Sequence, residues 1–160
     1  MTIPLLTSLA SAALRDIGIP APYTFGQADR VRFHELDVLN HVNNARYLSW
    51  FETFRIAYLR DYGISTYSDI ASRPVLVLKS VAVDYKAPLH LEDVYVVAGR
   101  TRAFRNTSWT MEYGVWSEGR LCATSTAVIV LMEADLVTRK KLPDSYVKAF
   151  TGRDDAVYEG

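Results

Sequence analysis

The sequence predicts an α+β domain in which one antiparallel β-sheet wraps around a single long central helix. Aromatic residues recur every three or four positions between residues 44 and 62, which predicts a helix that is apolar nearly all round and therefore buried. After Pro74 the chain changes to long apolar or alternating segments, which predict strands. With one long helix and one sheet, the sheet must curve around the helix to bury the aromatic stripe.

The elements are expected in the order short helix, strand, long helix and four strands. The N-terminal helix is expected over residues 5–16, and the first strand, in which apolar and charged residues alternate, over 29–37. Short polar connectors at 106–107 and 117–119 separate the last three strands at hairpin spacing, so these strands are expected to be antiparallel neighbours. The expected division is an N-terminal helix and linker (1–28), a single domain (29–150) and a C-terminal tail (151–160).

The composition is that of an ordinary globular protein, and the length of 160 residues suits one domain. Eighteen basic residues balance eighteen acidic ones, so neither nucleic acid nor a membrane surface is expected as a partner. Cys122 is the only cysteine and is expected in the core, which excludes an intrachain disulfide and a multi-thiolate metal site. The N-terminus lacks the early positive charge of a secretory signal, and no apolar run is long enough to span a bilayer; the expected location is the cytoplasm.

Polar residues crowd the junction between the first strand and the long helix. They are His34, Glu35, Asp37, Asn40, His41, Asn43 and Asn44. Asparagine is common at turns and helix starts, so Asn40, Asn43 and Asn44 each have a structural explanation as caps or turn residues. Asp37 and His41 have no comparably good structural explanation, because histidine is a poor cap and the carboxylate stands four residues before it. We therefore interpret Asp37 and His41 as a chemical centre.

The chemistry that such a junction favours is acyl transfer from a thioester. The free amides and positive dipole end of a buried helix can stabilise a developing oxyanion. A carboxylate just upstream can either attack an acyl carbon or polarise a water molecule. A thiolate leaves readily, since the pKa of a thiol is about 8.5, so thioester cleavage needs little beyond a base or nucleophile and an oxyanion site.

The run DVLNHVNNARY at residues 37–47 resembles the D-x-x-x-H-V-N-N-x-x-Y signature of the 4-hydroxybenzoyl-CoA thioesterase-like hotdog proteins. The similarity continues through the helix sequence YLSWFETFRIAYL and the strand entry VDYKAPLHLEDVYVV, over roughly residues 29–143. The resemblance implies a hotdog fold for residues 29–150 and hydrolysis of acyl thioesters, with coenzyme A thioesters as the first expected substrates and carrier-protein thioesters as the second. It implies no cofactor apart from the coenzyme A of the substrate.

Carried over by position, the resemblance also implies roles for single residues. Asp37 would be the base or nucleophile, and His41 would orient the substrate or help to stabilise charge at the thioester. The first-turn amides near Asn43 and Asn44 would bind the carbonyl oxygen of the substrate. Tyr47, the last residue of the signature, is expected to contact the substrate as well.

Other residues have weaker claims. Glu52 lies where some relatives carry an acidic residue near the site; the alternative is a helix-surface pair with Arg55. Leu39 stands where many acyl-ACP thioesterases carry asparagine, so this sequence lacks one of the polar site residues of those enzymes. His34 ends the strand that delivers the aspartate and could touch the substrate, whereas His90 is interpreted as a loop residue.

The histidines lack metal-motif spacing, so no metal is expected. Basic residues that could hold phosphates of coenzyme A, or simply form a solvated face, are Arg100, Arg102, Arg105, Arg139, Lys140 and Lys141.

The resemblance further implies a homodimer or homotetramer, because the family normally joins two sheets edge to edge and shares the site between subunits. Two other functions stay open. A hotdog hydratase or dehydratase acting on enoyl or 3-hydroxyacyl thioesters needs a proton-transferring histidine paired with an acid, which the aspartate-first signature does not resemble. A non-catalytic acyl-CoA-binding module would bind its ligand without turnover.

Overall fold

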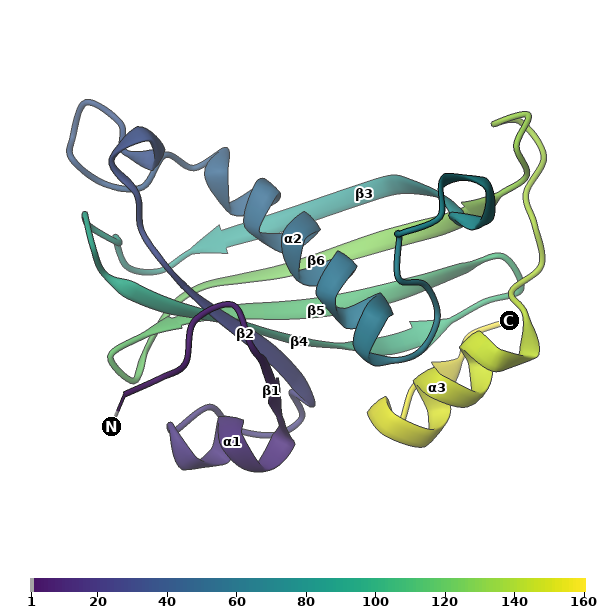
Figure 1. Ribbon diagram of the computed structural model, residues 1–160, viewed down its shortest axis with the longest axis horizontal. Helices are drawn as coiled ribbons and strands as arrows, with labels where there is room; N and C mark the ends of the chain where they lie inside the picture. The colour runs from purple at the N-terminus through teal and green to yellow at the C-terminus, as the bar shows by residue number, and fades with distance from the viewer. Residues whose placement is uncertain (1) are drawn as a thin grey trace.

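The computed structural model describes residues 2–160, in which α2 lies across one face of a seven-stranded sheet (Figure 1). The elements are β1 (Ser8–Ala10), α1 (Ser11–Asp16), β2 (Phe25–Arg30), η1 (Phe33–Glu35), α2 (Arg46–Asp61), η2 (Ile70–Ser72), β3 (Val75–Tyr85), β4 (Val94–Phe104), β5 (Ser108–Ser117), β6 (Arg120–Met132), α3 (Asp144–Asp154) and β7 (Val157–Tyr158). The sheet order is β1-β2-β4-β5-β6-β3, and β7 pairs in parallel with β4.

The aromatic stripe of α2 packs against the sheet, as predicted. Phe51 stacks on Tyr113 of β5 with ring centroids 4.9 Å apart, and Phe54 meets Phe25 of β2 at 5.4 Å. Together with Tyr58, these α2 residues are at most 1% exposed. Burial of each large apolar side chain contributes on the order of 2 kcal/mol, so this stripe fixes the helix on the sheet. The predicted long helix packed against an antiparallel sheet is confirmed, but the expectation that the helix is buried nearly all round is wrong, since Leu48, Glu52 and Arg60 are exposed.

Strands β4, β5 and β6 are antiparallel neighbours, which confirms the hairpin prediction. The connection from β5 to β6 turns through Glu118 and Gly119, whose φ angles of 50° and 73° are both left-handed. A two-residue turn with two positive φ angles matches the right-handed twist of the flanking strands. The hairpin therefore follows from the Glu-Gly pair and the alternating pattern on each side of it.

The N-terminal helix predicted over residues 5–16 is shorter than expected, because α1 begins only at Ser11. Leu6 has a left-handed φ of 55°, which interrupts a right-handed helix. The next residues form β1, which pairs antiparallel with β2 and places Leu9 opposite Gly26. The apolar residues that suggested a long helix are therefore shared between an edge strand and a helix of six residues.

The first strand, predicted over residues 29–37, is also misplaced: β2 spans Phe25–Arg30, and a 3-10 helix, η1, follows at once. Glu35 causes this turn. One carboxylate oxygen accepts a hydrogen bond from the Arg32 amide at 2.8 Å, and the other accepts one from Trp50 Nε1 at 2.8 Å. Because Glu35 is 6% exposed and held by a core tryptophan, the chain turns toward the core as a 3-10 helix instead of continuing as a strand.

The N-terminal segment covers part of the outer face of the sheet, the face away from α2. Leu14 of α1 is fully buried in a separate apolar cluster with Ala28 of β2, Ala98 of β4 and Trp116 of β5. A Cβ atom at Gly26 would come within 2.7 Å of Leu14 Cδ2, so glycine allows the close approach of α1 to β2. The fold thus has two apolar layers, one on each side of the sheet.

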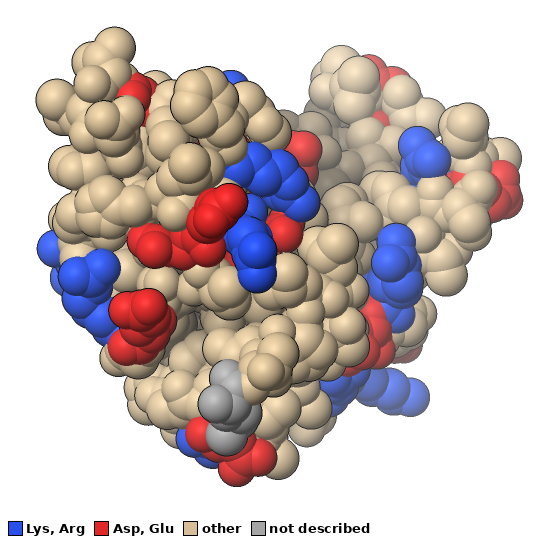
Figure 2. Space-filling model, turned by 60° about the vertical axis from the view of Figure 1, so that its left-hand side comes forward, with Lys and Arg blue, Asp and Glu red and all other residues tan. Residues whose placement is uncertain are grey.

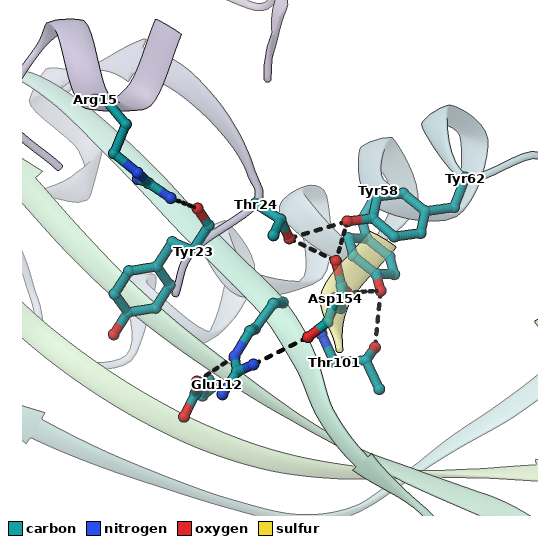
Figure 3. Close-up of polar contacts among 9 residues, drawn as sticks. Arg15, Tyr23, Thr24, Tyr58, Tyr62, Thr101, Glu112 and Asp154 are labelled. Atoms are coloured by element: carbon teal, nitrogen blue, oxygen red, sulfur yellow. Dashed lines mark hydrogen bonds and ion pairs between the residues drawn. The ribbon is translucent and has the colours of Figure 1, made fainter. Parts of the chain in front are cut away.

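The end of α3 is fixed to the sheet and to α2 by the buried carboxylate of Asp154, which is 1% exposed (Figure 3). It accepts hydrogen bonds from the hydroxyls of Thr24, Tyr58 and Tyr62, and from the Thr101 amide at 2.8 Å. Burial is the larger cause that raises the pKa of both tyrosines, and the negative charge of Asp154 raises it further. Both hydroxyls therefore remain protonated donors. Asp154 therefore joins four segments of the chain.

The surface carries both signs of charge. On the face shown in Figure 2, acidic and basic side chains lie interspersed rather than in a patch of one sign. An example is the pair of Arg32 and Asp29, whose charged atoms are 3.0 Å apart. None of the helices within residues 2–160 is long and apolar enough to cross a membrane.

Candidate active site

Asp37 opens a tight loop that leads to α2. Its amide donates to the His41 carbonyl at 2.8 Å, and its Oδ1 accepts from the amides of Leu39 at 2.9 Å and His41 at 3.3 Å. Asn40 has a left-handed φ of 60°, a conformation that asparagine tolerates. The expectation that Asp37 has no structural role is therefore wrong, because its carboxylate caps its own loop.

Four of the predicted site residues line one pocket of about 330 Å³: Asp37, His41, Asn44 and Tyr47. The pocket lies where this loop and the start of α2 meet the end of β3, and its other walls are Val42, Tyr85, Lys86, Ala87 and Pro88. The spacing of the signature thus brings together a carboxylate, an imidazole, an amide and a phenol.

Contacts with β3 hold the helical side of this pocket in place. The Tyr47 and Tyr85 rings meet edge to face, with centroids 5.1 Å apart, and the Tyr85 hydroxyl donates to the Asn44 carbonyl at 2.7 Å. Burial raises the pKa of both tyrosines, so both keep their protons at neutral pH. The start of α2 is therefore fixed relative to β3 by uncharged donors.

Two groups at the pocket retain unused hydrogen-bonding capacity within residues 2–160. The loop amides bind Oδ1 of Asp37, whereas its Oδ2 accepts no hydrogen bond. The Asn44 amide, just before α2, finds no acceptor. Free donors of this kind at a helix start can stabilise negative charge. The carboxylate is thus fixed by one oxygen and available through the other.

Asn43 and Glu52 do not line this pocket. The Asn43 side chain accepts from the Ala45 amide at 2.9 Å, which makes it a turn residue just before α2. Glu52 is exposed and lines a different pocket, which it shares with Arg55. No ion pair within residues 2–160 joins Glu52 to Arg55, so the expected surface pair is absent. His34 is exposed and lies outside the pocket as well.

His90 and Lys86 are the residues that the sequence pattern did not connect to the site. The His90 ring stands edge to face against His41, with centroids 5.1 Å apart, and its Nδ1 lies 3.6 Å from a carboxylate oxygen of Asp93. Lys86 follows β3 directly and lines the pocket. The backbone bond from Val42 to the carbonyl of Leu89, at 2.9 Å, brings the two loops together. No local sequence signal could reveal this pairing of distant loops.

The basic residues considered for coenzyme A phosphates lie elsewhere. Arg100 pairs with Glu112 at 2.6 Å and donates to the Asp154 carbonyl at 2.9 Å, so its guanidinium is already engaged. Arg105, just after β4, and the segment 139–141 lie at the opposite end of the sheet from the Asp37 loop (Figure 1). At the site itself, Lys86 is the cation in the pocket wall.

Residues 31–150 match the family model of the thioesterase-like superfamily. The chain belongs to this superfamily. Among other superfamily proteins, the putative acyl-CoA thioesterase YneP of Bacillus subtilis is 31% identical over 128 residues, which cover 74% of this chain and 92% of YneP. The long-chain acyl-CoA thioesterase FadM of Escherichia coli is 27% identical, over 71% of this chain and 85% of FadM.

Solved structures agree with this assignment. A thioesterase superfamily protein from Jannaschia sp. CCS1 superposes with a TM-score of 0.89 and 39% identity, over 97% of this chain and 98% of that one. A thioesterase from Thermus thermophilus, complexed with coenzyme A and Zn, gives a TM-score of 0.67 and 30% identity, over 80% of this chain and 94% of that one. The expected hotdog fold of the superfamily is confirmed.

Proposed function

We propose that the protein hydrolyses acyl-CoA thioesters to the free acid and coenzyme A. The observation that carries this proposal is the pocket lined by Asp37, His41 and Asn44, in which Asp37 Oδ2 and the Asn44 amide have no hydrogen-bond partner within residues 2–160. It combines a base or nucleophile with an oxyanion site, which is what thioester cleavage requires. The names of two relatives, the putative acyl-CoA thioesterase YneP and the long-chain acyl-CoA thioesterase FadM, support the choice of substrate.

In this proposal the loop amides hold Oδ1 of Asp37 so that Oδ2 faces the thioester. Oδ2 either attacks the acyl carbon or removes a proton from a water molecule that attacks it. The Asn44 amide and His41 stabilise the negative charge that develops on the carbonyl oxygen. The carbon–sulfur bond then breaks and coenzyme A leaves as a thiolate. In the first case the intermediate is a mixed anhydride of the acyl group and Asp37, which water hydrolyses to the free acid and the regenerated carboxylate; in the second case water attacks the acyl carbon directly and forms the free acid.

Lys86 completes the proposed substrate site. Lys86 stands in the wall of the same pocket as Asp37 and His41. A lysine at this place can bind a phosphate of coenzyme A as a point charge. The position suits a substrate whose phosphates lie outside the pocket and whose thioester lies inside it.

Thiol release from a panel of short, medium, long and aromatic acyl-CoAs tests the proposal. The wild-type protein should turn over at least one of them with saturation kinetics. Saturable binding without thiol release would instead identify an acyl-CoA-binding module. Hydration of crotonyl-CoA that outruns its hydrolysis, followed by loss of the enone absorbance, would identify a hydratase.

We infer that the protein forms a homodimer in which β3 pairs with β3 of a second copy. β3 is an edge strand of 11 residues that pairs with β6 on one side only. Val77 and Leu78 on this strand are 38% and 42% exposed. A long apolar edge strand is a template for pairing with another chain. Such pairing would bring the second copy close to the candidate active site, because β3 ends at Tyr85 in its wall.

Val77→Glu should weaken this dimer by about tenfold or more, because it places a carboxylate from each copy at a desolvated contact. Light scattering after size-exclusion chromatography at several concentrations measures the effect, and thioesterase activity should fall with the dimer. Val157→Glu is the matched control, since Val157 is an exposed valine of β7. A monomeric wild-type protein, or an unchanged dimer in Val77→Glu, would exclude the β3 interface.

A further inference from the structure

One flank of α2 connects the candidate active site to a second pocket. Leu48, Glu52, Arg55 and Leu59 recur along this flank at helical steps of three and four, and Asn44 stands just before the helix. Glu52, Arg55 and Leu59 line a pocket of about 230 Å³ between α2 and β3. Asn44 lines the candidate active site. This flank of the helix therefore begins next to the first pocket and leads to the second.

The second pocket has an apolar floor. Ile56 and Leu59 of α2 face Leu76 and Leu78 of β3, and Ile129 of β6 completes this surface. Apolar groups also remain accessible between the two pockets. Leu48, on the same flank of α2, is 40% exposed. This path suits the methylene groups of an acyl chain, whose burial is favourable for each carbon.

Arg55 is a partly buried cation without an anionic partner. Its Nη1 donates to the Tyr113 hydroxyl at 3.3 Å, and this is its one side-chain hydrogen bond within residues 2–160. No ion pair of that part of the chain includes it. A guanidinium group has five N–H donors, so most of its capacity is unused. Cations that lose contact with water are normally paired.

We propose that Arg55 binds a carboxylate at the far end of the acyl group, so that the preferred substrates are coenzyme A thioesters of medium-chain dicarboxylic acids. The proposal rests on the proposed function and adds the acyl group to it. Arg55 lies eight residues after Tyr47, which is roughly 12 Å along the helix axis. A medium-length chain spans this separation, and a guanidinium group binds a carboxylate with two parallel hydrogen bonds.

Glu52 opposes such a substrate. It shares the second pocket with Arg55 but forms no ion pair with it, and its exposed carboxylate would repel an incoming one. The two residues therefore act in opposite directions on the same group of the substrate. Removal of the Arg55 charge should lower the preference for a dicarboxylic acyl group, and removal of the Glu52 charge should raise it.

The test compares kcat/KM for decanedioyl-CoA and decanoyl-CoA, which differ only at the far end of the chain. The wild-type enzyme should prefer decanedioyl-CoA. In Arg55→Met this ratio should fall by about tenfold or more, because the charged hydrogen bonds are lost, while decanoyl-CoA turnover rises. Glu52→Gln should raise the ratio. Arg60→Met is the matched control, since Arg60 is exposed in the last turn of the same helix and should leave the ratio unchanged.

Binding separates failure of this proposal from failure of the proposed function. Calorimetric titration of the Asp37→Asn protein with each thioester measures the same preference without turnover. Binding preference without hydrolysis by the wild type would contradict the thioesterase assignment and leave the role of Arg55 standing. Hydrolysis with no preference, or with a ratio that Arg55→Met does not change, would overturn the role of Arg55. So would dissociation of the Arg55→Met dimer, because Arg55 would then pair with the second copy.

Discussion

Replacement of Asp37 by asparagine should lower kcat/KM for the best acyl-CoA by roughly 10³-fold, the scale of a lost catalytic base, with almost no change in melting temperature. Asparagine keeps an Oδ1 that can accept from the Leu39 and His41 amides, so the loop persists. It lacks the negative oxygen that attacks or deprotonates. Thiol release and thermal unfolding, measured on the same preparation, check both parts.

Asp37→Ala should lose as much activity as Asp37→Asn, but it should also be less stable. Alanine also removes the cap, which costs about 1 kcal/mol. Asp135→Asn is the matched control, since the Asp135 carboxylate accepts from the amides of Val137 and Thr138 in another loop. It should retain full activity. An active Asp37→Asn enzyme would show that the reacting group lies elsewhere in the pocket.

Asp154→Ala should destabilise the protein by about 3–5 kcal/mol, because it leaves four donors from three segments without their acceptor. The hydroxyls of Thr24, Tyr58 and Tyr62 and the Thr101 amide would all lose their partner. For a chain of this size the melting temperature should fall by about 10 °C. Urea unfolding followed by tryptophan fluorescence measures the free energy directly.

Asp155→Asn is the control for this change, because Asp155 is the next residue, exposed and left-handed with a φ of 53°. Asparagine tolerates that conformation, so the stability should change by less than about 0.5 kcal/mol. Equal stability of Asp154→Ala and Asp155→Asn would show that water replaces the carboxylate of Asp154 at no cost.

The sequence predicts the central helix and the strands that follow it because their signals are periodic and local. Phe51, Phe54 and Tyr58 recur at helical spacing, and each is buried where the pattern requires. The predictions for the N-terminal helix and the first strand are wrong because contacts between residues distant in sequence determine these elements. β1 forms because β2 offers it an edge, and the strand before η1 ends because Glu35 reaches Trp50, fifteen residues later.

The same distinction applies to the site. Asp37, His41 and Tyr47 lie within one short motif, so their spacing was enough to place them around one pocket. His90 and Lys86 come from the loop after β3, and only the folded topology brings that loop to His41. Local spacing also cannot tell a capping carboxylate from a reactive one, whereas the contacts of the two oxygens of Asp37 can.

The segment that covers part of the outer face of the sheet also restricts which surfaces of the chain a second copy could contact. Leu9 and Leu14 occupy the surface of β2 and β4 on that side, so a second sheet cannot stack there. Association of two copies through this part of the outer face would require the N-terminal segment to detach and expose its own apolar cluster to water. The segment before β2 therefore keeps a second sheet away from β2 and β4.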